Sequence, residues 1–225
     1  MTTPRITVLQ PDPAASLDRF TDWLTEAGAA VDVVDLTATD VPETVGDGVI
    51  VLGGINDARS YPWVGDLHAA LRDWVSAGIP VLGICLGAQL LADAHDGDLD
   101  FGLEGEEGAV EVELMEAAAP EPVFVGLESP LVVPEHHHDV ITALPPGAEL
   151  LAASKRYEVQ AFRLGSAVGV QFHPEASPET MATWTTQSGG DGDAMLAEMQ
   201  DVDDRVSETG RRIARNFVTI LMERH

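Results

Sequence analysis

Strand-like runs and helical stripes alternate through the first 95 residues of this chain, and their order limits the folds available to it. Apolar runs typical of buried strands occupy 6–9, 31–36, 48–54 and 79–85. Apolar residues at helical spacing occupy 17–27, 67–75 and 86–94. Repeated strand–helix units build a mostly parallel sheet with helices on both faces. The sequence therefore predicts an α/β fold.

The second half of the chain has a different pattern. Apolar and polar residues alternate with period two in 109–115 and in 158–162, the latter close to a strand-like run at 149–154. These segments predict a few antiparallel strands added to the main sheet. A buried-strand pattern returns at 167–172, and about 30 C-terminal residues have helical spacing that predicts a C-terminal helix. Because no internal repeat or long linker interrupts the sequence, we expect residues 1–225 to form a single domain.

The charge of the chain narrows the choice of partners. Its 225 residues include 38 Asp and Glu against 12 Lys and Arg, which leaves a formal net charge of −26. Such a surface repels nucleic-acid phosphates and anionic lipids. No apolar run approaches the roughly 20 residues that a membrane span requires. We therefore expect neither a nucleic-acid nor a membrane role, whereas the oligomeric state stays open.

The cysteine content bears on the compartment. Cys85 is the only cysteine, so the chain cannot form an internal disulfide. The N-terminal segment has no basic stretch followed by an apolar one, as an export signal would. Both features favour the reducing cytoplasm.

The acidic residues are unevenly placed. No Lys or Arg occurs between Arg72 and Lys155, an interval with 16 acidic residues, 11 of them between Asp93 and Glu121. A solvated face explains this stretch most simply. Adaptation to high salt and docking to a basic partner are the alternatives, and composition does not separate them.

Cys85 lies where a predicted strand ends and a predicted helix begins, with Gly83 and Gly87 on either side. Small flanking residues permit the tight turn that exposes a nucleophile above a sheet edge. The N-terminus of the following helix would favour the thiolate over the thiol. A lone cysteine is otherwise a small buried apolar residue. The setting makes Cys85 a candidate nucleophile.

Two further segments supply what a cysteine nucleophile needs. His173 follows a buried strand in QFHPE (171–175), and Glu175 is placed to bind the far nitrogen of its ring. The strand 48–54 ends in glycines, so Gly54 could offer its N–H to an oxyanion, with the N–H of Leu86 as the second donor. Taken singly, each segment would be an ordinary loop. The position of QFHPE after the cysteine turn, and the presence of all three segments in one chain, make the catalytic interpretation stronger.

The stretches GICLGAQLL (83–91), QFHPE (171–175) and LGG (52–54) together make the chain resemble the class I, or triad, glutamine amidotransferase family. It is more narrowly similar to stand-alone members that resemble the glutaminase domain of GMP synthase. The similarity extends over nearly the whole chain, up to a closing TGRRIARNF segment (209–217). The resemblance implies a flavodoxin-like sheet and no cofactor.

The resemblance also implies roles for single residues. Cys85 would be the nucleophile, His173 the base and Glu175 the residue that orients it, with Gly54 and Leu86 as oxyanion donors. Gln89 matches a glutamine that helps to hold the substrate. His137 and Asp139 match a His-x-Asp segment beside the α-amino and carboxylate groups of the substrate. Ile55 stands where the family often has proline.

The implied reaction is hydrolysis of the side-chain amide of glutamine to glutamate and ammonia through a thioester. The ammonia would pass to a synthetase on a separate chain. Two alternatives remain: a γ-glutamyl hydrolase or peptidase that uses the same triad on a larger substrate, and a catalytically idle binding or regulatory protein.

Two other motifs suggest ligand sites less strongly. His136, His137 and His138 are consecutive, which invites a metal interpretation. Consecutive side chains point in different directions, however, and no cysteine or carboxylate cluster is evident to complete a ligand set, so we expect no metal site. SGGDGD (188–193) lacks the lysine of a phosphate loop and is expected to be a flexible loop.

Overall fold

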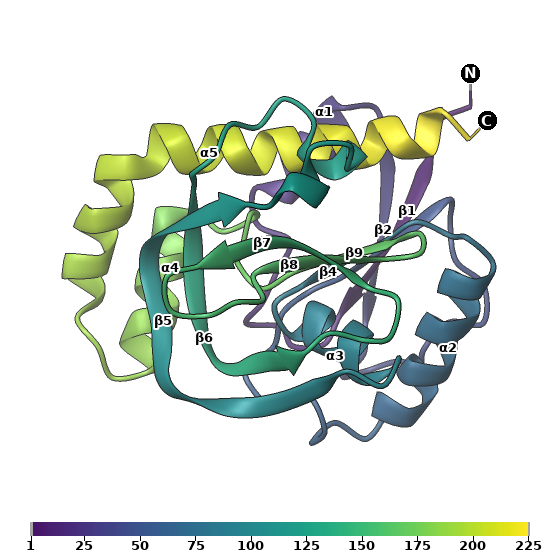
Figure 1. The fold of residues 1–225 in the computed structure, drawn as a ribbon, viewed down its shortest axis with the longest axis horizontal. Coiled ribbons are helices and arrows are strands. Elements are labelled where there is room, and N and C mark those ends of the chain that lie inside the picture. The colour runs from purple at the N-terminus through teal and green to yellow at the C-terminus, as the bar shows by residue number, and fades with distance from the viewer. Residues whose placement is uncertain (1, 225) are drawn as a thin grey trace.

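The computed structural model describes residues 2–224, and its centre is one mixed β-sheet (Figure 1). Its strand order is β2-β1-β3-β4-β9-β8-β7-β5-β6. The strands from β2 to β9 in this order pair in parallel, and those from β9 to β6 pair antiparallel. The strands are β1 Arg5–Gln10, β2 Ala30–Asp35, β3 Gly48–Val51, β4 Val81–Ile84, β5 Asp98–Leu114, β6 Leu131–Ala143, β7 Glu149–Ser154, β8 Ala161–Leu164 and β9 Ala167–Val170.

Helices cover both faces of this sheet. They are α1 Phe20–Glu26, α2 Val64–Ser76, α3 Leu86–Asp93, α4 Pro178–Gln187 and α5 Gly192–Met222, with 3₁₀ turns η1 Glu116–Ala118 and η2 Pro122–Phe124. Buried residues of α1 and of the C-terminal half of α5 join one hydrophobic core, and those of α2 and α3 join a second. Buried residues of α4 and of the N-terminal half of α5 form a third, smaller core. Figure 1 shows α5 running along the sheet from the α4 side towards the N-terminal strands. The predicted α/β fold is confirmed.

The first two of these cores follow from side-chain alternation along the short parallel strands. Successive residues of a strand point to opposite faces. In β3, Val49 and Val51 pack in the core under α2 and α3, whereas Ile50 and the following Leu52 pack in the core under α1 and α5. All four are fully buried, which explains why the strand appears in the sequence as a continuous apolar run.

The antiparallel part differs from the sequence prediction in its extent. Residues 109–114 of the first alternating segment belong to β5, which begins earlier, at Asp98, and the segment 158–162 becomes a strand only at Ala161. The sequence did not predict β6 or α4. The expected loop at 188–193 is partly wrong, because Gly192 begins α5 and the Asp191 side chain caps it by accepting from the amide of Ala194.

Salt should stabilise this fold. Self-repulsion at a net charge of −26 acts over a Debye length of about 10 Å at 0.1 M salt, and this length shortens as salt is added. We expect Tm to rise between low salt and about 1 M sodium chloride. Scanning calorimetry in sodium and potassium chloride checks this, since screening predicts equal effects of the two salts. A flat or falling curve would show that the acidic groups are already paired or well separated.

Across the part of the chain that is described, no helix is long and apolar enough to cross a membrane.

Candidate active site

Cys85 forms a strained turn between β4 and α3. Its backbone has φ 50° and ψ −108°, in a region that non-glycine residues rarely adopt. Its amide donates to the carbonyl of Val170 at 2.8 Å, which ties the turn to the end of β9. A Cβ on Gly83 would lie 2.6 Å from the Gly87 oxygen, and one on Gly87 would lie 2.1 Å from the Val51 oxygen. Close backbone packing therefore requires both flanking glycines.

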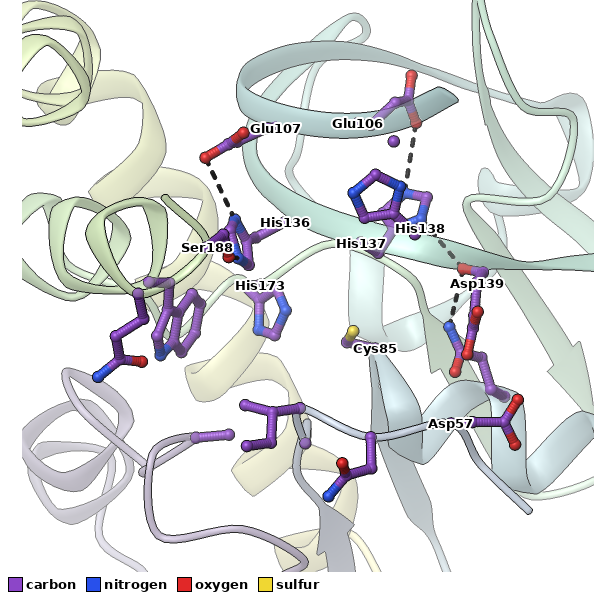
Figure 2. Close-up of a pocket in the computed structure, with 18 of the residues that line it drawn as sticks. Asp57, Cys85, Glu106, Glu107, His136, His137, His138, Asp139, His173 and Ser188 are labelled. Carbon is purple, nitrogen blue, oxygen red and sulfur yellow. Dashed lines mark hydrogen bonds and ion pairs between the residues drawn. The ribbon is translucent and has the colours of Figure 1, made fainter. Parts of the chain in front are cut away.

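His173 follows β9, the strand that pairs with β4, so the sheet places it beside Cys85. Its Nδ1 donates to Glu175 Oε1 at 2.8 Å, and the side chains of His173 and Glu175 are 4% and 1% exposed. A Cβ on Gly53 would lie 2.9 Å from the His173 ring and 3.7 Å from Cys85 Cβ. Figure 2 shows the His173 ring and the Cys85 sulfur facing the same cavity. Because Nδ1 is bound to Glu175, Nε2 is the nitrogen left for chemistry.

The electrostatics of this group favour a charged imidazole. Burial lowers the pKa of His173, but the Glu175 carboxylate and the Cys85 sulfur more than offset this effect and hold the pKa well above its usual value. An imidazolium is the natural partner of a thiolate. The arrangement therefore places a positively charged ring beside the Cys85 sulfur.

Gly54 and Leu86 come from two segments that meet beside Cys85. A Cβ on Gly54 would lie 2.6 Å from both the Leu86 side chain and the Tyr61 hydroxyl. That hydroxyl accepts a hydrogen bond from the Asn56 amide at 3.2 Å, which holds the loop. Leu86 is the first residue of α3, where amides have no partner within the helix. The site thus has backbone amides near Cys85 that could serve an oxyanion.

These groups line a cavity of about 620 Å³. Gln89, His137 and Asp139, which the sequence predicts to bind the substrate, line it together with Cys85 and His173 (Figure 2). The side-chain amide of Gln89 donates to the backbone carbonyl of Asp139 at 3.0 Å, and this hydrogen bond holds the Gln89 side chain beside Asp139. Leu86 and Glu175 lie behind the lining residues, within α3 and after β9.

The site also contains two residues, Gln171 and Trp184, that the sequence analysis did not single out. Gln171 donates to the Cys85 sulfur at 3.6 Å and receives a hydrogen bond from Gln89 at 3.3 Å. Trp184 of α4 packs against the His173 ring, with centroids 4.7 Å apart, and its indole donates to the Ala14 carbonyl. The position of Gln171 two residues before His173 was a usable signal, whereas nothing in the sequence near Trp184 pointed to the site.

In the cavity wall formed by β5 and β6, the surroundings of the three consecutive histidines differ in one respect from the sequence prediction. They do diverge, because His137 is buried while His136 lies near Trp184 and His138 stacks on Phe101. The expectation that no carboxylate cluster accompanies them is wrong: Glu106 and Glu135 lie beside His137. The two glutamates are 29 residues apart in sequence and meet only through the pairing of β5 and β6.

The fold and this cavity define a class of protein. A family model described as glutamine amidotransferase class-I matches residues 18–188, and the chain belongs to this family. Among its relatives, the glutamine-hydrolyzing GMP synthase subunit of Thermococcus kodakarensis is 37% identical over 132 residues, which are 58% of this chain and 66% of that protein. The corresponding protein of Methanopyrus kandleri is 35% identical over 143 residues, 61% and 72% of the two chains. The chain thus spans about two thirds of the length of the first of these relatives.

Solved structures agree on the fold. A glutamine amidotransferase from Thermotoga maritima has a TM-score of 0.85 and 26% identity, covering 97% of this chain and 99% of that one. A protein from Thermoplasma acidophilum, described as a GMP synthase subunit, has a TM-score of 0.73 and 25% identity, covering 100% and 96%.

Proposed function

We propose that this chain hydrolyses the side-chain amide of glutamine to glutamate and ammonia. The observation that carries the proposal is the convergence of three features on one cavity: a cysteine held at positive φ before a helix, a buried histidine and a glutamate bound to that histidine. Family membership supports the same chemistry.

The residues divide the reaction between them. The Cys85 thiolate attacks the amide carbon, and the amides of Gly54 and Leu86 hold the resulting oxyanion. The carbon–nitrogen bond breaks as the His173 imidazolium protonates the departing ammonia, which leaves a thioester on Cys85. His173, now neutral, takes a proton from water, and the hydroxide releases glutamate and restores the thiolate. Glu175 keeps the ring oriented and stabilises its charged form.

The cavity wall bears on how glutamine would sit. Asp57, Glu106, Glu107 and Asp139 line the cavity, and among the described lining residues there is no Lys or Arg. This wall suits the α-ammonium group of glutamine. Gln89, His137 and Asp139 would lie around that end of the substrate, opposite the amide at Cys85.

The decisive experiment measures ammonia and glutamate release from glutamine by the purified protein. A panel of γ-glutamyl amides and peptides belongs in the same assay. Release from glutamine with a preference over the panel supports the proposal. Failure to hydrolyse any of these compounds, with no thioester trapped on Cys85, would favour an idle binding protein.

The size of the cavity supports one alternative, a γ-glutamyl hydrolase for larger substrates. About 620 Å³ falls within the range of roughly 300–1,000 Å³ typical of pockets for drug-sized ligands, and exceeds what glutamine fills. Within the panel, this alternative predicts faster hydrolysis of γ-glutamyl compounds with neutral or cationic amine portions than of glutamine. The acidic wall should reject anionic ones such as γ-glutamyl-glutamate.

The cysteine should react as a thiolate. A chloroketone analogue of glutamine should alkylate Cys85 at neutral pH, because a neighbouring imidazolium favours the reactive thiolate form of a cysteine, and free glutamine should slow the reaction. Intact-mass spectrometry would show one adduct per chain and none on Cys85→Ala. Alkylation at the same rate with and without glutamine would contradict binding of glutamine at this site. Because this chemistry requires Cys85 in its reduced, unoxidised form, a reducing compartment such as the cytoplasm suits the protein.

A synthetase on a separate chain would receive the ammonia. The relatives that are named as subunits of GMP synthase imply such a division in their own enzymes. Slow hydrolysis in the absence of the partner would then avoid loss of ammonia. Ile55 follows the oxyanion glycine and is 68% exposed at the cavity rim, where a partner chain could cover it.

The stiffness of this loop can be tested directly. If a mobile Gly53–Gly54 pair leaves one oxyanion donor turned away, Ile55→Pro should raise the slow activity of the isolated chain, by up to about 100-fold. Steady-state glutaminase assays check this, with Ile55→Val as the matched control that keeps a mobile backbone. Robust activity of the unmodified chain alone would contradict control by a partner.

A further inference from the structure

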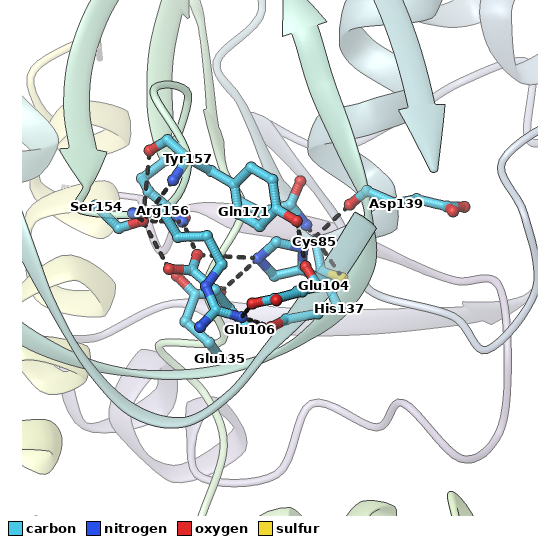
Figure 3. A network of polar contacts seen from close by, with 12 residues as sticks. Cys85, Glu104, Glu106, Glu135, His137, Asp139, Ser154, Arg156, Tyr157 and Gln171 are labelled. Carbon is cyan, nitrogen blue, oxygen red and sulfur yellow. Dashed lines mark hydrogen bonds and ion pairs between the residues drawn. The ribbon is translucent and has the colours of Figure 1, made fainter. Parts of the chain in front are cut away.

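A second cluster of functional groups lies in the part of the cavity wall that β5 and β6 form. Glu106 stands directly opposite His137 in the antiparallel pair, and Glu135 precedes His137 by two residues, so all three side chains share one face. They are almost completely buried, with side-chain exposures of 5%, 2% and 0% for Glu106, His137 and Glu135. Figure 3 shows the two carboxylates converging on the His137 ring.

The polar contacts of this cluster are incomplete. His137 Nδ1 lies 3.1 Å from the Asp139 carbonyl oxygen, which can only accept, so Nδ1 carries the hydrogen. His137 Nε2 lies 3.5 Å from Glu106 Oε2 and 3.4 Å from Glu135 Oε2. Nε2 and both oxygens of Glu135 make no hydrogen bond, and in the described chain neither glutamate forms an ion pair with Lys or Arg. Two buried carboxyl groups thus face Nε2 of His137 with no Lys or Arg of the described chain beside them.

The spacing is that of metal ligands. A tetrahedral ion with bonds of about 2.1 Å holds its ligand atoms about 3.4 Å apart. The Nε2–oxygen distances of 3.4 and 3.5 Å agree with this value and are long for hydrogen bonds, and all three ligand atoms lie within 4.8 Å of one another. A divalent ion at this position would balance the charge of both carboxylates.

The surroundings are also those of a ligand set. Metal-binding histidines usually donate their other ring N–H to a carbonyl or carboxylate, as His137 does to the Asp139 carbonyl. Glu106 is held by Ser154, which donates to Oε1 at 2.7 Å, and by Gln160, which donates to Oε2 at 2.5 Å. One imidazole with two carboxylates suits Zn²⁺ better than Mg²⁺ or Ca²⁺, which take oxygen ligands.

We propose that Glu106, Glu135 and His137 form a binding site for a divalent transition-metal ion, of which Zn²⁺ fits best. The ion ties β5 to β6 and fixes the His137 ring at the wall of the cavity. It is a structural ion in this proposal, because its three ligands leave Cys85, His173 and Glu175 free for their own chemistry.

Calorimetric titration of chelator-treated protein with zinc chloride tests the site. A Cys85→Ala background prevents zinc from binding the thiolate, and 1 M potassium chloride suppresses weak binding by the acidic surface. We expect one zinc ion per chain and a higher Tm with zinc than without. Glu135→Gln and Glu106→Gln should each weaken binding at least about tenfold. Glu111→Gln, an exposed residue of β5, is the matched control and should bind zinc like the background protein.

Zinc X-ray absorption on the Cys85→Ala protein gives a measurement that needs no ligand variant. It should show nitrogen and oxygen neighbours at about 2.0–2.1 Å with a single imidazole. Absence of stoichiometric zinc binding would overturn the proposal. So would equal affinity in Glu135→Gln and the background protein, or a spectrum with two or more imidazoles, which would assign the zinc to the other histidines.

Discussion

Replacing Cys85 with alanine should abolish turnover, lowering kcat by about 10⁴-fold or more while leaving the fold in place. Removal of the nucleophile from a catalytic triad has effects of this order, because no other group forms the covalent intermediate. Alanine keeps the Cβ that Cys85 already carries at φ 50°, so the substitution adds no backbone strain. Ammonia release measured at high protein concentration checks the loss.

The same variant shows whether any loss is specific. Cys85→Ala should retain glutamine binding in calorimetry and melt within a few degrees of the unmodified protein, because the buried sulfur is a small part of the core. Equal turnover in the two proteins would contradict the assignment of Cys85. Loss of binding together with loss of the fold would show a structural role instead.

Glu175→Gln should be the second most damaging substitution, with an expected loss of about 10⁴-fold in kcat, as for the orienting carboxylate of other triads. The neutral amide that replaces the carboxylate cannot stabilise a charged imidazole, so the pKa of His173 should fall. The consequence for Cys85 follows: without the imidazolium, its sulfur loses the neighbouring cation that favours a thiolate over a thiol. The alkylation profile of Cys85 should therefore shift to higher pH.

Rates of alkylation across pH 5 to 10 separate this role from simple damage to the structure. Glu179→Gln is the matched control, since Glu179 is exposed on the first turn of α4, four residues beyond Glu175. It should leave both the rate and the pH profile unchanged. A Glu175→Gln profile that coincides with that of the unmodified protein would mean that Glu175 does not tune His173.

The parts of the fold that the sequence predicted well are those governed by local rules. The parallel strands appear as apolar runs because both faces are buried. The turn at Cys85 was recognisable because close packing leaves room only for glycine at 83 and 87. α4 was missed because PETMATWTTQ has few apolar residues and several threonines, although Ser177 before Pro178 is a helix-start signal that the structure confirms as an N-cap.

The parts that could not be predicted depend on strand pairing. β6 contains a proline and three histidines, so it lacks the regular alternation that marks a strand. Its register with β5 includes a shift between Phe101 and Glu106, and that shift decides which glutamate faces His137. Because pairing over such a distance leaves no local trace, the buried cluster of Glu106, Glu135 and His137 could not be recognised before the strands were paired.

The position of β9 in the sheet has a consequence for a growing nascent chain. β9 lies between β4 and β8, yet it is synthesised more than 80 residues after β4. Until it inserts, β4 is an open apolar edge of the kind that promotes aggregation, and Cys85 has no histidine beside it. Incomplete chains that lack β9 and His173 are therefore expected to aggregate readily and to have no hydrolytic activity. Acquisition of activity and closure of the sheet become a single late event in biosynthesis.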